Sequence, residues 1–309
     1  MSAPTQTRLR SAVQTQRRRT GSTHLPHHHL PRGRRVRNVL WSLAAVLLAA
    51  VWVFPVYWMV NSAFLSNVTL QRSTPTWLPF AGSLENFRHV FADGGFVTAL
   101  GISLTATLLT VAVAIVVAFL GALAISRFRF RGRRSFVLAM LLVQMLPAEG
   151  MFLAQFKMMA SWGLVNNVLG LTLLYAAAVI PFTLWMLRGF VAGVPVELEE
   201  AAMVDGLSRT QAFLRITFPL LAPGLVASAV YAFLQAWNEF TIALVVMQSD
   251  EVRTLPLWLR GLVQASATRE TDWGLVMAGS TMVAVPVIVF FMIVQSKMSS
   301  GLVGGAVKG

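Results

Sequence analysis

The sequence Glu200-Ala201-Ala202-Met203-Val204-Asp205-Gly206 lies in a polar segment between two long apolar runs. This segment predicts a short helix that starts at Pro195, because proline suits the first helical position, where its missing N–H would be unpaired anyway. Glu197 and Glu199 then lie in the early turns, where the helix dipole favours negative charge. Gly206 falls where the C-terminus of a helix takes a left-handed residue.

A second short helix is expected to follow the first. Ser208-Arg209-Thr210-Gln211 has the spacing of a capping box, in which the first and last side chains cap a helix N-terminus. The apolar face of this second helix would include Phe213 and Ile216. In the first helix, the small side chains of Ala201 and Ala202 give a partner close access. An ordinary solvated surface helix is the alternative interpretation.

The composition is that of a membrane protein. Of the 309 residues, 56% are hydrophobic and only 12% are charged, a balance typical of chains with several membrane spans. The chain contains no cysteine, which excludes disulfides and thiolate-bound metals. It also lacks a Gly-x-x-x-x-Gly-Lys-Ser/Thr phosphate loop, so ATP-driven work would need an ATPase on another polypeptide.

Six stretches are apolar and long enough to cross a bilayer, which takes about 20 residues. Pro147 and Glu149 interrupt the third stretch, and Pro181 and Pro286 are expected to bend the fourth and the sixth. We therefore expect an all-α polytopic membrane protein with one six-span domain over residues 38–296. The six stretches cover approximately residues 39–60, 97–125, 136–159, 169–190, 223–247 and 273–295.

Lysine and arginine are distributed unevenly between the two sides of the predicted spans. If both termini are cytoplasmic, nineteen of these residues lie inside and six lie outside, which fits the positive-inside rule. Nine of the nineteen precede the first span, within residues 1–37, which carry no acidic residue. This orientation places the segment Glu200–Gly206 in the cytoplasm, where ATP is found.

The polar segment resembles a known family motif. The pattern Glu-Ala-Ala, three residues, Gly, nine residues, Ile, two residues, Pro is similar to the coupling loop of binding-protein-dependent ABC importer permeases. In that family the loop, here residues 192–222, docks into a groove on the ATP-hydrolysing subunit. The resemblance implies a type I ABC importer permease with a cytoplasmic coupling helix. The residues that match the motif or lie within it are Glu200, Ala201, Ala202, Asp205, Gly206, Ile216 and Pro219.

The resemblance also implies the partners and the solute. The partners would be a second permease, two ATP-binding subunits and an extracytoplasmic solute-binding protein, assembled in the inner membrane. ATP and Mg would be bound by the ATPase subunits, so this chain is expected to be neither an enzyme nor a cofactor-binding protein. Trp237-Asn238-Glu239-Phe240 and residues 301–309 resemble carbohydrate-importer permeases similar to the smaller maltose permease subunit. They imply sugars or oligosaccharides. The resemblance covers the chain from about residue 38 and departs at residues 154–157.

Several polar side chains fall within the predicted spans, where contact with lipid is costly unless they face partners or water. Gln235, Asn238 and Glu239 are candidates for the translocation path or for contact with the second permease. Hydrogen bonding between helices is an equal alternative, since buried polar residues commonly hold spans together. The other polar side chains of the spans are Gln144, Glu149 and Lys157.

The spans are flanked by two tails. Residues 1–37 are expected to be a disordered cytoplasmic tail that contacts anionic lipid. No aromatic residue is present there to stack bases, which argues against nucleic-acid binding. His24 and His27 to His29 lack a second cluster of ligands for a metal. Residues 297–309 are expected to form a flexible cytoplasmic C-terminus.

The main alternative is an ion-gradient-driven secondary transporter with Glu149, Lys157 and Glu239 as relays. Such a protein has no need of a capped Glu-Ala-Ala loop, and the sequence shows no inverted repeat. An intramembrane enzyme is less compatible, because no Ser/His, paired Asp or His-Glu-x-x-His arrangement falls within the spans.

Overall fold

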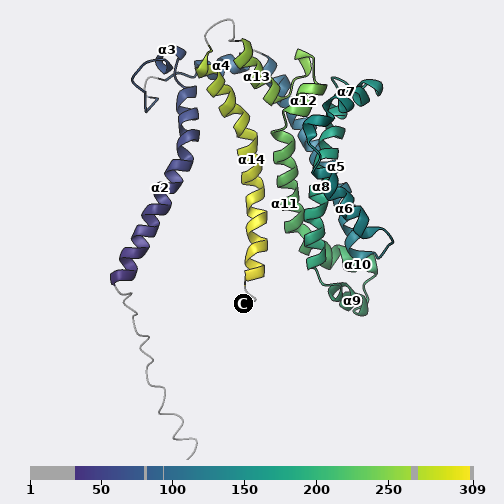
Figure 1. Cartoon of the computed structure of the whole chain (residues 1–309). Coiled ribbons are helices and arrows are strands. Elements are labelled where there is room, and N and C mark those ends of the chain that lie inside the picture. Colours follow the sequence, from purple (N-terminus) through teal and green to yellow (C-terminus); the bar gives the residue numbers. More distant parts are fainter. Residues whose placement is uncertain (1–31, 80–81, 93, 266–270, 307–309) are drawn as a thin grey trace, which may run out of the picture. The chain divides into compact units, whose positions relative to one another are not determined.

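The computed structural model describes residues 32–79, 82–92, 94–265 and 271–306, and every regular element among them is helical (Figure 1). The chain divides into two compact units, Met1–Pro55 and Val56–Gly309. The boundary falls inside the first described helix, α2 (Arg32–Ala63). The described part of the first unit is therefore helical from Arg32, and all other described helices belong to the second unit.

Five helices among the described residues are long and apolar enough to cross a membrane. Four of the six predicted spans are confirmed as single helices. At six of the eight helix ends, the observed boundary lies within three residues of the predicted one. These four are α2, α5 (Gly95–Arg127), α8 (Val168–Gly193) and α14 (Trp273–Ala306). The other two predicted spans differ from the expectation in informative ways.

The third predicted span is divided into separate helices. α6 (Arg133–Gln144) is followed by a 3-10 turn, η1 (Ala148–Met151), and by α7 (Phe152–Ser161). Pro147 stands directly before η1 with an extended backbone, and proline has no N–H to donate to the preceding turn. The interruption predicted at Pro147 is therefore present, and it leaves two helices that are each too short to cross a bilayer.

The fifth predicted span begins earlier and ends earlier than expected. α10 (Arg209–Ala212), a π-helical turn η2 (Phe213–Thr217) and α11 (Phe218–Trp237) follow one another without a break. The second short helix of the polar segment is thus the beginning of a span and not a separate surface helix. The helix ends at Trp237 and not at residue 247, because Asn238 caps α11 and a new helix, α12 (Thr241–Val246), begins.

The core of the second unit lies where α5, α8 and α11 pack against one another. α5 turns small side chains toward this core, all but one of the intervals between them being three or four residues, which is the spacing of one helical face. Small residues let the backbones of membrane helices approach closely. Gly224 of α11 serves the same purpose, since a Cβ atom there would collide with the ring of Phe190 in α8. The small buried residues of α5 are Ala99, Ser103, Ala106, Thr107, Thr110, Ala114, Ala118 and Ala122.

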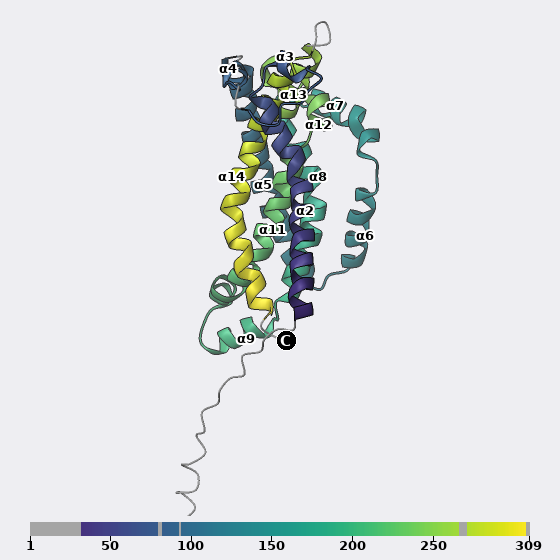
Figure 2. The ribbon, with the colours of Figure 1, turned by 90° about the vertical axis from the view of Figure 1, so that its left-hand side faces the viewer.

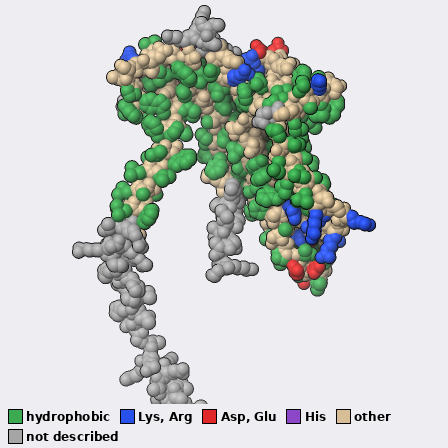
Figure 3. All heavy atoms as spheres, in the orientation of Figure 1, with side chains coloured by type: hydrophobic (Ala, Val, Ile, Leu, Met, Phe, Trp, Pro, Cys, Tyr) green, Lys and Arg blue, Asp and Glu red, His purple; other side chains and the backbone are tan. Residues whose placement is uncertain are grey.

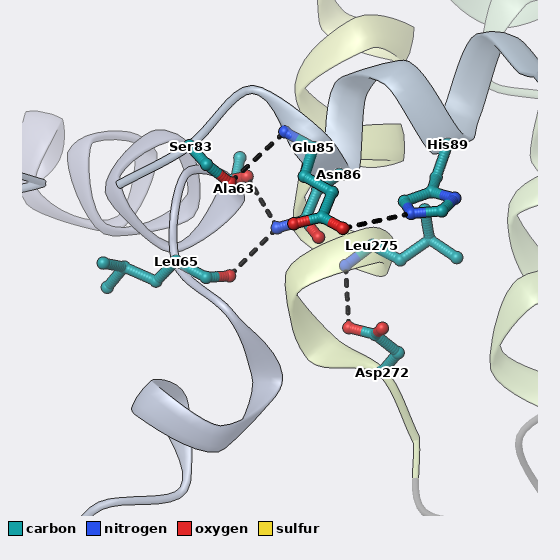
Figure 4. Close-up of polar contacts among 8 residues, drawn as sticks. All are labelled: Ala63, Leu65, Ser83, Glu85, Asn86, His89, Asp272 and Leu275. Atoms are coloured by element: carbon teal, nitrogen blue, oxygen red, sulfur yellow. Dashed lines mark hydrogen bonds and ion pairs between the residues drawn. The ribbon is translucent and has the colours of Figure 1, made fainter. Parts of the chain in front are cut away.

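Short helices cover one end of this unit (Figure 2), and side-chain hydrogen bonds join them to the spans. The amide nitrogen of Asn86 in α4 (Glu85–Ala92) donates to the carbonyl oxygens of Ala63 and Leu65, at 3.0 and 2.9 Å (Figure 4). Asp272 caps α14 by accepting from the N–H of Leu275 at 3.1 Å. The other short helices at this end are α3 (Asn67–Leu70), α12, η3 (Asp250–Val252), α13 (Leu255–Ala265) and α7.

The structure describes only part of the two predicted tails. α2 begins at Arg32, inside the predicted N-terminal tail, and residues 1–31 with their four histidines lie outside the described residues. α14 continues as a helix through Ala306, inside the predicted C-terminal tail, and residues 307–309 lie outside the described part. α8 and α14 also continue through Pro181 and Pro286.

Candidate coupling surface

The predicted first helix of the polar segment is α9 (Glu197–Val204), which begins two residues after the predicted start at Pro195. Its C-terminus has the geometry expected from Gly206, which takes the left-handed conformation at φ +92°. The N–H of Gly206 donates to the carbonyl of Met203, and the N–H of Leu207 donates to that of Ala202, both at 3.1 Å. This pair of bonds is a Schellman motif, so the predicted helix stop is confirmed.

The predicted capping box is confirmed as well. The N–H of Gln211 donates to the hydroxyl oxygen of Ser208 at 3.3 Å, and the N–H of Ser208 donates to the side-chain oxygen of Gln211 at 3.0 Å. The chain thus leaves α9 through one cap and enters α10 through another, with Leu207 between them. Two defined caps around so short a connection fix the orientation of α9 relative to α10.

One face of α9 points into the protein and carries a buried carboxylate. Glu199 accepts a hydrogen bond from the hydroxyl of Thr217 at 2.7 Å and forms an ion pair with Arg127 at 3.3 Å. The side chains of Glu199 and Arg127 are only 12% and 16% exposed. Ala202, three residues after Glu199, is buried on the same face. No sequence motif links Glu199 with Arg127 or Thr217.

The other face of α9 is exposed and mixes apolar with acidic side chains. Val204 is 87% exposed, Leu198 is 41% exposed and Met203 is 38% exposed. Glu197 and Glu200 are exposed beside them. Figure 3 shows acidic and basic side chains gathered at this end of the molecule. We call the exposed residues of α9 and its cap the coupling surface: Glu197, Leu198, Glu200, Ala201, Met203, Val204, Asp205 and Gly206.

The structure brings only part of the predicted coupling set onto this surface. Glu200, Ala201, Asp205 and Gly206 are exposed there, whereas Ala202 is buried. The two remaining members belong to the next helical rod. Ile216 is half-buried in the π turn η2, and Pro219 is exposed in the first turn of α11.

The candidate path residues lie at the end of α11: Gln235 is in its last turn, within the span Arg209–Trp237, whereas Asn238 and Glu239 follow it. The Glu239 carboxylate accepts from the N–H of Ile242 at 2.7 Å and from that of Ala243 at 3.1 Å, so it caps α12. The side-chain amide of Asn238 donates to the carbonyl of Leu234 at 2.8 Å, one turn back. Gln235 is exposed on the last turn of α11. These contacts favour a structural role for Glu239.

The remaining polar residues of the predicted spans do not form a relay with Glu239 among the described contacts. The Gln144 amide reaches the carbonyl of Ala178 at 3.5 Å, and Lys157 is exposed on α7. The side chain of Glu149 lies outside the described residues. Within the described ranges, no group of three or more His, Cys, Asp or Glu side chains is arranged to hold a metal ion.

The described residues thus form five helices of membrane-spanning length and a short helix, α9, that is capped at its C-terminus, which is the architecture of an integral membrane protein. The chain belongs to the family of binding-protein-dependent transport system inner membrane components, whose model matches residues 114–301. It is therefore an inner-membrane permease subunit of an ABC importer and not the ATP-hydrolysing subunit. Family membership also removes the alternative of an ion-gradient-driven transporter.

Curated relatives match along most of their length. The diacetylchitobiose uptake system permease protein DasC of Streptomyces coelicolor is 41% identical over 268 residues, which cover 87% of this chain and 96% of DasC. The trehalose transport system permease protein SugB of Mycobacterium tuberculosis is 31% identical, with 88% and 98% covered. The trehalose/maltose transport system permease protein MalG of Thermococcus litoralis is 32% identical, with 89% and 98% covered.

The fold matches that of a solved importer. One chain in the crystal structure of a bacterial ABC transporter involved in the import of the acidic polysaccharide alginate superimposes with a TM-score of 0.71. The match covers 86% of this chain and 98% of the other at 23% identity. The architecture of this permease is therefore shared with that transporter.

Proposed function

We propose that this chain is a permease subunit of an ABC importer for sugars or oligosaccharides. The relatives named above handle diacetylchitobiose, trehalose and maltose, according to their names. Residues 237–240 and 301–309 point to the same solute class. The chain would work with a second, related permease, two ATP-binding subunits that hold ATP and Mg, and an extracytoplasmic solute-binding protein.

The segment α6–η1–α7 supplies the sixth membrane crossing in this proposal. α6 lies toward the α9 end of the bundle and α7 lies at the opposite end, in both views (Figures 1 and 2). An interrupted crossing is compatible with a membrane where the freed backbone groups are buried in protein or meet water. Six crossings put both termini on one side, and the charge distribution favours the cytoplasm for that side.

The coupling surface would dock into a groove on an ATP-binding subunit. The observation that carries this proposal is the exposure of Leu198, Met203 and Val204 on α9, a helix that is capped at its C-terminus. Exposed apolar side chains grouped with charges mark interaction sites on proteins. A rigid, capped helix transmits the closure of the ATP-binding subunits to the spans, whereas a flexible loop would absorb it.

Gln235 and Asn238 remain candidates for the translocation path or for contact with the second permease. Both are exposed in this single chain, and they lie where α11 ends. The Glu239 side chain is assigned to capping instead, because its two oxygens are already used by the backbone of α12.

The decisive experiment is purification of the tagged chain from its native membrane in mild detergent, with the co-purifying proteins identified by mass spectrometry. We expect a second permease and an ATP-binding subunit. Glu200→Lys is expected to lose the ATP-binding subunit while the second permease remains. Glu251→Lys, which changes an exposed glutamate at the opposite end, is the control and is expected to retain both.

Two results would contradict the proposal. Retention of the ATP-binding subunit by Glu200→Lys would separate α9 from the docking site. Undiminished uptake of labelled oligosaccharides by a strain that lacks this chain would remove the sugar assignment and leave the family membership untouched.

A further inference from the structure

We infer that Glu199 is the residue through which motion of the coupling helix α9 reaches the spans. We call its contacts with Arg127 and Thr217 the joint. This inference rests on the proposed docking of α9 and identifies the residue that carries the motion inward. The Glu199 carboxylate is held by two other elements at once, namely the end of α5 through Arg127 and the π turn before α11 through Thr217. Glu199 is therefore a positioning residue, while the outer face of α9 meets the partner.

The ion pair is suited to this role because it is shielded from water. Both side chains are more than four-fifths buried, so their attraction is screened far less than that of an exposed pair. Arg127 occupies the last turn of α5, where the negative end of the helix dipole also favours a cation. A displacement of α9 would pull Arg127 with it, because separating the pair would leave an uncompensated buried charge.

The polar contacts that join α9 to other helices are made by the side chain of Glu199. In the ranges that the structure describes, no other side chain of α9 forms an ion pair or a side-chain hydrogen bond with another helix. Glu197 and Glu200, on the same helix and of the same chemical type, are exposed. The three neighbouring glutamates thus divide into one that faces the spans and two that face outward.

The π turn places the second contact of the joint. The N–H of Phe218 donates to the carbonyl of Phe213, five residues earlier, whereas the corresponding bond of an α-helix spans four residues. Thr217, the last residue of this turn, is fully buried and points its hydroxyl at Glu199. Such turns are frequent at functional sites, and here one lies between α10, which follows the proposed docking helix α9, and α11.

The test is a set of substitutions in the complete importer, reconstituted with its solute-binding protein in proteoliposomes. Three quantities are measured for each variant: retention of the ATP-binding subunits, ATP hydrolysis, and solute taken up per ATP hydrolysed. For Glu199→Gln we expect the subunits to be retained and the uptake per ATP to fall about fivefold or more, the lower end of typical coupling between distant sites. Glu251→Gln, which neutralises an exposed glutamate of η3 outside the coupling surface, is the control and is expected to leave the ratio unchanged.

A second pair of variants tests the joint without removing a charge. Thr217→Val removes the hydroxyl while keeping the side-chain shape, and we expect it to lower the uptake per ATP. Thr217→Ser keeps the hydroxyl and is expected to restore the ratio. If Glu199→Gln fails to assemble, this pair alone decides the question. A purely structural role would lower the unfolding temperature of Thr217→Val without changing its uptake per ATP.

The inference is overturned if Glu199→Gln or Thr217→Val retains the ATP-binding subunits and the normal uptake per ATP. That result would leave the proposed function intact. If the docking proposal itself is wrong, Glu200→Lys would instead retain the ATP-binding subunits. The two failures are therefore distinguishable in the same set of preparations.

Discussion

The side-chain oxygen of Asn166 accepts a hydrogen bond from the backbone N–H of Gln248 at 2.6 Å, across 82 positions of sequence. The same oxygen accepts from the N–H of Ser249 at 3.0 Å, and the N–H of Asn166 donates to the carbonyl of Val246 at 2.9 Å. Asn166 has a left-handed backbone with φ +58°, a conformation that asparagine tolerates better than most residues. One side chain thus joins the turn before α8 to the turn after α12.

Asn166→Ala is expected to destabilise the chain by about 3–4 kcal/mol. The substitution removes two acceptor contacts, worth about 1 kcal/mol each, and places alanine in the left-handed region at a further cost of about 1–2 kcal/mol. Thermal unfolding in detergent measures the effect. Asn166→Asp keeps the acceptor oxygen and the conformational tolerance, so it is the control. An equal loss in both variants would contradict this account.

Gly206 is required for its conformation and not for space, since a Cβ atom there would meet nothing within 4 Å. Gly206→Pro is expected to leave membrane insertion intact but to uncouple uptake from ATP hydrolysis. The fixed φ of proline is incompatible with φ +92°, and the N–H that donates to the carbonyl of Met203 is lost. Gly206→Asn is expected to retain most uptake, because asparagine is the usual second choice at this position. Normal uptake by the proline variant at normal expression would refute the prediction.

Gly224→Ala is expected to weaken the packing of α11 against α8. The added methyl group would collide with the ring of Phe190, and overpacking of this kind costs about 1–3 kcal/mol. We expect a lower unfolding temperature, and partial recovery when Phe190→Leu is added to make room. The double variant is the informative one, because recovery requires that the two side chains meet. A double variant less stable than Gly224→Ala would exclude a direct collision.

Glu239→Gln is expected to retain solute uptake. The carboxylate caps α12 through two backbone N–H groups, and glutamine keeps one oxygen that can accept. Glu239→Ala removes the cap and is expected to cost about 1 kcal/mol of stability. The two variants separate a cap from a proton relay, because a relay requires a group that titrates. Complete loss of uptake in a well-folded Glu239→Gln protein would favour the relay.

Local features of the fold could be predicted from the sequence. The left-handed Gly206 and the capping box at Ser208 and Gln211 are set by residues within four positions of one another, and both were found as expected. Long apolar runs identified four helices, because the hydropathy of a continuous stretch does not depend on residues far away in the sequence. The interruption at Pro147 also followed from one residue, because proline removes a donor wherever it stands.

The features that were missed depend on residues far apart in the sequence. Glu199 and Glu200 are adjacent and chemically alike, and the sequence motif drew attention to the exposed one. Only the position of α5 shows that Glu199 faces Arg127, 72 residues earlier. A helical-face argument could have paired Glu199 with the small Ala202, but it could not have named the partner. The end of the fifth helix was missed because apolar residues continue on both sides of Asn238 and Glu239, so hydropathy did not mark the boundary.

The unbroken helix from Arg209 to Trp237 contains 29 residues, which at about 1.5 Å per residue makes a rod about 43 Å long. In a rod of this length, a small change of tilt becomes a large displacement of the far end. A tilt of only a few degrees about a point near Thr217 carries the Trp237 end through a displacement of about 2–3 Å, estimated from the same rise per residue. The opposite end can therefore be rearranged while every backbone hydrogen bond of the rod is kept. The speed of the transport cycle would then depend on how quickly whole helices slide past one another, with no turn of helix melting or re-forming.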